Sequence, residues 1–217
     1  IKDPRLCRLL PLWRDVFARM NVTPGYLLIA RHPAEVVASL RARDGMDEDR
    51  ALVLWLLHVL ESVTGTAPAI TGARRAFLTY EGLLRDWEGS LERVMDALGV
   101  RFPLSPDAVR AEITEFLTPS LRHHQVNQQQ PASDLYTRWA LPAYTAFSAL
   151  ADGDDSALST LLDIEREISS WLARLTPNML AGADAQPFTI AMLKAQSVVP
   201  APNPKFSIII PCFNKVE

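Results

Sequence analysis

YLLIARHP, residues 26–33, is the stretch that decides the fold class of this 217-residue chain. Its first five residues are continuously apolar, which is typical of a strand buried on both faces of a parallel sheet. Arg31 and His32 follow, and Pro33 stands where helices favour proline, at the first position. The stretch therefore predicts a buried strand that ends at an arginine and passes directly into a helix.

The segments around this stretch alternate between strand and helix patterns. Residues 75–79 (RAFLT) predict a second short strand, and residues 205–211 predict a third. The order strand–helix–helix–strand–helix indicates an α/β domain with a parallel sheet flanked by helices and a helix-rich C-terminal half. Ligands bind beyond the carboxyl ends of such strands, so the junctions 30–31 and 79–80 are the first places to look. Apolar spacing and turn residues predict helices at 6–20, 33–43, 47–63, 80–98, 105–117, 134–150 and 156–175.

Composition and charge exclude several classes of protein. The chain is 48% hydrophobic and its formal net charge is −3, so neither a disordered chain nor a nucleic-acid coat is expected. Its longest apolar run, residues 52–57, is far shorter than the roughly 20 residues that span a bilayer. Residues 1–43 hold eight basic and three acidic side chains. This excess favours a small anionic ligand near the N-terminal end.

Cysteine and histidine spacing predicts no metal site. Cys7 and Cys212 stand at opposite ends of the chain, and His123 and His124 have no third ligand at a recognisable distance. The chain opens at Ile1 with neither an initiator methionine nor a signal peptide, so we expect a fragment of a cytoplasmic protein. No pattern predicts an oligomeric state.

Arg31 and Ser39 are the main candidates for binding an anion. A helix that starts after Arg31 would present free backbone N–H groups and the positive end of its dipole. The guanidinium adds a planar pair of donors for phosphate oxygens, and Ser39, six residues beyond Pro33, can donate a hydroxyl. The alternative is that Arg31 is a surface arginine and Ser39 an exposed helix residue.

The pattern Arg-x-Pro followed by serine in residues 31–39 resembles the 3′-phosphate-binding segment of sulfotransferases that use 3′-phosphoadenosine 5′-phosphosulfate. The resemblance implies an incomplete P-loop-NTPase-like sheet in which Arg31 and Ser39 hold the 3′-phosphate of this co-substrate. Residues 2–4 (KDP) are similar to a Lys-Asp-Pro that ends a core strand in bacterial and protein-tyrosine sulfotransferases. Lys2 would then be catalytic, because an ammonium stabilises charge developing on the leaving oxygen. The resemblance implies no metal.

Two further segments carry this resemblance, which covers residues 1–125 and, more loosely, the chain to 175. TYEGLL, residues 79–84, looks like the family's Tyr-Glu-x-Leu element, which implies that Tyr80 lies near the adenosine. The alternative is a core tyrosine. Residues 119–134 are polar and irregular, and Leu-Arg-His within them is similar to a piece found in bacterial relatives. Arg122 is therefore a candidate contact to the donor phosphates, and a solvated loop is the alternative.

The expected reaction is transfer of a sulfuryl group to a hydroxyl or amine of a small-molecule or glycan acceptor. The glycine-rich loop that cradles the phosphosulfate in this family is not among the 217 residues, so we expect this chain alone to be inactive. Two alternatives stay open. One is an accessory module of a nucleotide-sugar glycosyltransferase, and the other is a non-catalytic helical interaction module.

The C-terminal end carries a second resemblance. Residues 176–204 contain five prolines and predict a linker after a sulfotransferase-like domain at 1–175. FSIIIPCFN, residues 206–214, is similar to the opening strand of inverting family-2 glycosyltransferases, so residues 205–217 are predicted to start such a domain. The alternative is a plain hydrophobic strand that completes the first sheet.

Overall fold

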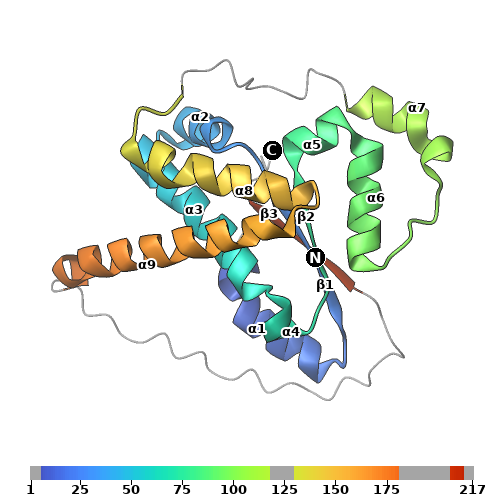
Figure 1. Ribbon diagram of the computed structural model, residues 1–217, viewed down its shortest axis with the longest axis horizontal. Coiled ribbons are helices and arrows are strands. Elements are labelled where there is room, and N and C mark those ends of the chain that lie inside the picture. The colour runs from blue at the N-terminus through green and yellow to red at the C-terminus, as the bar shows by residue number, and fades with distance from the viewer. Residues whose placement is uncertain (1–5, 118–129, 181–205, 213–217) are drawn as a thin grey trace.

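The computed structural model describes residues 6–117, 130–180 and 206–212, with the backbone alone described at 175–180 and 206–212 (Figure 1). Two predicted site residues, Lys2 and Arg122, lie outside these ranges. Arg31, Ser39 and Tyr80 lie within them.

Three parallel strands form the sheet. They are β1 (Pro24–Ala30), β2 (Arg75–Thr79) and β3 (Phe206–Cys212), and β1 lies between the other two. Ala30 is in register with Thr79 of β2 and Cys212 of β3, so the carboxyl ends of the strands meet at one edge. The mixed α/β class predicted from the sequence is confirmed. β1 begins at Pro24, and the chain turns shortly before it at Asn21, whose φ is 52°.

Helices make up most of the rest of the described chain. The helix after β1 has the proline start that the sequence predicted, since Pro33 opens it, and Gly45 ends it with φ 61°. The helices are α1 (Leu6–Arg19), α2 (Pro33–Asp44), α3 (Glu48–Gly65), α4 (Pro68–Thr71), α5 (Tyr80–Arg85), α6 (Trp87–Leu98), α7 (Pro106–Phe116), α8 (Leu141–Ala151) and α9 (Leu158–Leu180). A π-helical turn (Tyr136–Ala140) precedes α8, and a 3₁₀ turn (Asp155–Ala157) precedes α9.

The two faces of the sheet are covered unequally. Tyr26, Leu28 and Ala30 of β1 face a large core shared with α1, α2, α3, α8 and α9. On the opposite face, Leu27 and Ile29 join a small core completed by β2, α5 and α6. In Figure 1, α3, α8 and α9 gather on one side of the strands, and α6 and α7 stand at the other end of the molecule.

The short helix α4 was not predicted, and two of the predicted helices have different bounds. The predicted helix 80–98 is divided into α5 and α6 at Asp86, whose carboxylate accepts a hydrogen bond from the backbone N–H of Gly89 and so caps the second helix. The predicted helix 156–175 extends as α9 to Leu180, into the segment expected to be a linker. Within the described ranges, no helix has both the length and the apolarity needed to cross a membrane.

The strand near the C-terminus joins the main sheet. β3 pairs in parallel with β1 over its whole length, from Pro24–Phe206 to Ala30–Cys212. This pairing is the arrangement of the alternative interpretation, a strand that completes the first sheet. The assignment of residues 205–217 to a glycosyltransferase-like domain stays a prediction.

Candidate functional site

Two predicted site residues meet at the carboxyl edge of the sheet. Arg31 follows the last residue of β1, and Tyr80 follows the last residue of β2. The guanidinium carbon of Arg31 lies 5.1 Å from the centre of the Tyr80 ring. At this distance the cation is attracted by the aromatic face. The parallel pairing of β1 with β2 therefore brings together the two junctions that the sequence singled out.

Arg31 is paired with a buried carboxylate on α2. Its Nε donates a hydrogen bond of 2.6 Å to Oε2 of Glu35, four residues along the chain. The Arg31 side chain is 17% exposed and that of Glu35 is 5% exposed. A carboxylate this deeply buried needs such a partner. The two terminal amino groups of Arg31 have no hydrogen-bond partner among the described residues, so part of the guanidinium remains available to a ligand.

The backbone at Arg31 is held from the core. The indole N–H of Trp55, a fully buried residue of α3, donates to the carbonyl oxygen of Arg31 at 3.0 Å. This bond satisfies the tryptophan's only polar group and ties the end of β1 to α3. The arginine is therefore presented from a fixed strand end.

The first turn of α2 is closed by the protein itself. The backbone N–H of His32 donates to Oε1 of Glu81 at 3.2 Å, and that of Ala34 donates to Nδ1 of His32 at 3.3 Å. The N–H groups of Glu35 and Val36 both donate to the carbonyl of His32. The prediction that free N–H groups of this turn receive a ligand anion is therefore wrong. The anion at this helix terminus is the carboxylate of Glu81, which the helix dipole stabilises.

Glu81 also links this turn to α8. The hydroxyl of Tyr144 donates to Oε2 of Glu81, and the ring of Tyr144 meets the imidazole of His32 edge-on, with centroids 4.9 Å apart. Burial and the charge of Glu81 raise the pKa of Tyr144 well above its usual range, so the phenol stays protonated. One carboxylate thus joins the end of β2, the start of α2 and the middle of α8.

The surroundings of His32 favour its neutral form. Burial lowers its pKa, and the negative charges of Glu81 and Glu35 oppose this effect. A neutral ring is also what the helix cap requires, because Nδ1 can accept the N–H of Ala34 only without a proton. We call the residues around this junction the strand-end cluster: Arg31, His32, Glu35, Tyr80, Glu81 and Tyr144.

Ser39 lies farther along α2 on the side of Glu35. It follows Glu35 by four residues, which is about one helical turn, and its side chain is half-buried. No hydrogen bond joins it to Arg31 in the part of the chain that the structure describes. The structure thus orders Arg31, Glu35 and Ser39 along one side of the helix, with the glutamate between the two predicted phosphate contacts.

Two cavities lie away from this cluster. One, of about 410 Å³, lies between α3 and α9 and is lined by Leu54 and Trp171 among others. The other, of about 790 Å³, lies between α6 and α7. Neither is lined by Arg31 or Ser39. In the described ranges, no group of three histidine, cysteine, aspartate or glutamate side chains is placed to hold a metal ion.

Sequence reasoning missed four members of the cluster, namely His32, Glu35, Glu81 and Tyr144. Glu35 has a local signal, since an acid four residues from an arginine commonly pairs with it on a helix. Glu81 stands next to Tyr80, but its partners lie 49 and 63 residues away along the chain. No local pattern indicates those contacts.

Comparison with known proteins adds no relative to this description. No family model, no curated protein and no solved structure matches the chain. Interpretation of the site therefore depends on its geometry and chemistry.

Proposed function

We propose that this chain is part of a sulfotransferase with an incomplete P-loop-NTPase-like sheet, and that the strand-end cluster binds 3′-phosphoadenosine 5′-phosphosulfate. The observation that supports this proposal is the meeting of Arg31 and Tyr80 at the carboxyl ends of adjacent parallel strands. Ligands of open α/β sheets bind at this edge. The reaction would transfer a sulfuryl group to a hydroxyl or amine of a small-molecule or glycan acceptor.

The described residues offer a nucleotide both a charge and an aromatic face. The terminal amino groups of Arg31 supply the planar donors that a phosphate accepts, and Nε is already committed to Glu35. The Tyr80 ring lies against the same guanidinium, which suits a site shared by a phosphate and the adenosine next to it. Ser39 would add a hydroxyl donor from the next turn of α2.

Charge in the cluster limits what Arg31 can do alone. Glu35 and Glu81 both lie within hydrogen-bonding distance of the β1–α2 junction, against the one positive charge of Arg31. A phosphate therefore needs further cations. Lys2, as the catalytic residue, and Arg122 are the predicted sources. Lys2 would stabilise the leaving oxygen during a transfer in which the protein mainly positions reactants and offsets charge.

Binding of adenosine 3′,5′-bisphosphate to the full 217-residue chain tests the proposal. Calorimetry should show that Arg31→Ala weakens binding by about 1.5–3 kcal/mol, the scale of hydrogen bonds to charged groups. Ser39→Ala should weaken it by about 1 kcal/mol.

Arg43→Ala is the matched control for Arg31→Ala. Arg43 lies on the same helix, is exposed and pairs with its neighbour Asp44, so its loss changes the net charge equally. Equal affinities in the Arg31→Ala and Arg43→Ala proteins, both shown by circular dichroism to be folded at the assay temperature, would refute the site.

A further inference from the structure

The helix α7 has an apolar face that the described structure covers only in part, since Val109 and Ile113 are half-buried and Phe116 is exposed. None of its residues is buried, although Val109, Ile113 and Phe116 give it an amphipathic pattern. An isolated amphipathic helix of this length is marginal unless its apolar face is packed. The structure thus presents a helix whose hydrophobic side borders open space.

That space is the cavity of about 790 Å³ between α6 and α7, which we call the α6–α7 groove. Trp87, Leu91 and Met95 line it from α6 at intervals of four residues, and Val109 and Ile113 line it from α7. The lining of α6 runs from Trp87 to Asp96, which corresponds to a length of about 14 Å. The groove therefore follows nearly three turns of helix.

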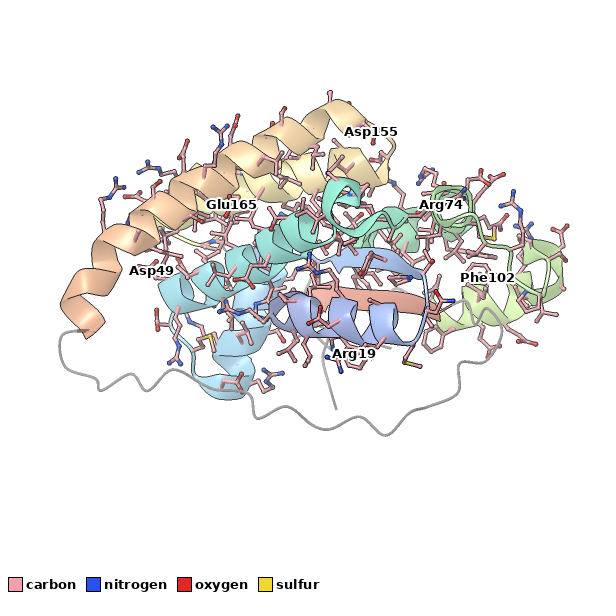
Figure 2. All side chains as sticks on the ribbon, turned by 90° about the horizontal axis from the view of Figure 1, so that it is seen from below. Arg19, Asp49, Arg74, Phe102, Asp155 and Glu165 are labelled. Carbon is pink, nitrogen blue, oxygen red and sulfur yellow. The ribbon has the colours of Figure 1, made fainter. Side chains whose placement is uncertain are left out.

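The connection between the two helices is also apolar and exposed. Phe102 and Leu104 line the groove and are 51% and 61% exposed. Figure 2 shows Phe102 at the end of the molecule opposite Asp49, well away from the larger core. Large apolar side chains gathered in one exposed place commonly mark an interaction site.

The rim of the groove is acidic. Glu88, Glu92, Asp96 and Glu112 line it against a single basic residue, Arg101. Arg101 pairs with Asp96, and Arg110, outside the lining, pairs with Glu88. Glu92 and Glu112 are exposed and have no ion-pair partner within the described residues. Two carboxylates are thus left to meet a cationic partner.

We infer that the α6–α7 groove binds an amphipathic helix with basic residues beside its apolar face. Leucine-like side chains at i, i+3, i+4 and i+7 would enter between α6 and α7, as in other helix-in-groove complexes. Lysine or arginine residues flanking that ridge would reach Glu92 and Glu112. An anionic surface, whether a phospholipid headgroup layer or a nucleic acid, is repelled by the same rim. The inference does not depend on the sulfotransferase proposal.

A pair of synthetic helices tests the inference on the full chain. Each peptide has about four helical turns with leucine at i, i+3, i+4 and i+7, and the remaining positions are lysine in one and glutamate in the other. Fluorescence anisotropy of the labelled peptides should show saturable binding of the lysine peptide and at least about tenfold weaker binding of the glutamate peptide. Absence of binding by the lysine peptide, or equal binding of both, overturns the inference.

Substitutions of two glutamates on α7 distinguish binding in the groove from attraction to the net negative charge of the chain. Glu112 lines the groove, whereas Glu115 is exposed on the same helix and does not. Glu112→Lys should weaken lysine-peptide binding about fivefold, and Glu115→Lys by less than about twofold, although both change the net charge equally. Equal effects of the two substitutions would contradict binding in the groove.

Leu104→Ser tests the apolar contribution. Leu104 is mostly exposed, so its replacement should leave the unfolding transition unchanged. The affinity for the lysine peptide should fall about fivefold or more, because an apolar contact is lost. Undiminished peptide binding by this variant would also overturn the inference.

Discussion

The strand-end cluster and the α6–α7 groove handle their charged groups in opposite ways. In the cluster, Glu35 is buried against Arg31, and Glu81 accepts hydrogen bonds from His32 and Tyr144. In the groove, Glu92 and Glu112 stand exposed beside apolar side chains that the described structure leaves half-buried or exposed. The first region is completed by contacts within the chain, and the second offers its contacts outward. Substitutions should therefore affect stability in the first region and binding in the second.

The largest difference in unfolding free energy is expected between substitutions of two aromatic residues, one in each region. Trp55→Ala removes a fully buried side chain and its bond to the Arg31 carbonyl, so it should lower the free energy of unfolding by about 3–5 kcal/mol. Phe102→Ala in the groove removes a half-exposed ring and should change it by less than about 0.5 kcal/mol. Urea unfolding of both variants measures the contrast. Comparable losses would show that the groove is part of the stabilising core.

Substitution of one glutamate in each region should give an intermediate difference in unfolding free energy. Glu35→Gln leaves the mostly buried Arg31 without its counter-charge and should cost about 2–3 kcal/mol in unfolding free energy. Glu88→Gln breaks the pair with Arg110, which is half-exposed, and should cost less than about 1 kcal/mol. Urea unfolding at neutral pH compares them. A cost below 1 kcal/mol for Glu35→Gln would mean that Arg31 is solvated without it.

The smallest expected effect is the contribution of His32 to the pH dependence of stability. Burial lowers the pKa of His32 in the folded protein, so the unfolded chain binds a proton more readily. Stability from this group is present above about pH 6.5 and is lost as the pH falls toward the folded pKa. Between pH 7.5 and 5.5, His32→Asn should reduce the fall in unfolding free energy by about 1 kcal/mol, because asparagine still caps the helix but does not titrate.

The residual pH dependence of the His32→Asn protein provides the internal check. Burial also lowers the pKa of His58, so part of the acid destabilisation should remain in that variant and vanish only in the double variant His32→Asn/His58→Gln. A His32→Asn protein with the full pH dependence of the parent would show that the imidazole does not titrate as the cap geometry requires.

Local patterns predicted the helices and strands better than the boundaries between consecutive helices. The run at residues 26–30 and the proline at 33 correctly predicted β1 and the start of α2, because burial on both faces and a first-turn proline leave marks in consecutive residues. The division between α5 and α6 was missed, since the helical spacing continues through Asp86 and only its capping bond interrupts the helix.

The candidate site was predicted in part. Arg31 and Tyr80 were chosen separately, at the ends of two strands, and the parallel pairing of those strands brings them together. The expected free N–H groups after Arg31 are occupied by Glu81 and His32 instead. The role of Glu81 was beyond sequence reasoning, because Glu81 reaches the helix only once β1 and β2 lie side by side.

Sequence alone determined the α/β class, the parallel strands and the position of an arginine at a strand end, because each depends on the chemistry of neighbouring residues. Tertiary structure alone decided which charges are neutralised. Glu81 meets His32 and Tyr144 across 49 and 63 residues of chain, and α7 is left with no fully buried residue. Hydrogen bonds and burial depend on distance in space, and a linear pattern records that distance only within a helix, a strand or a turn.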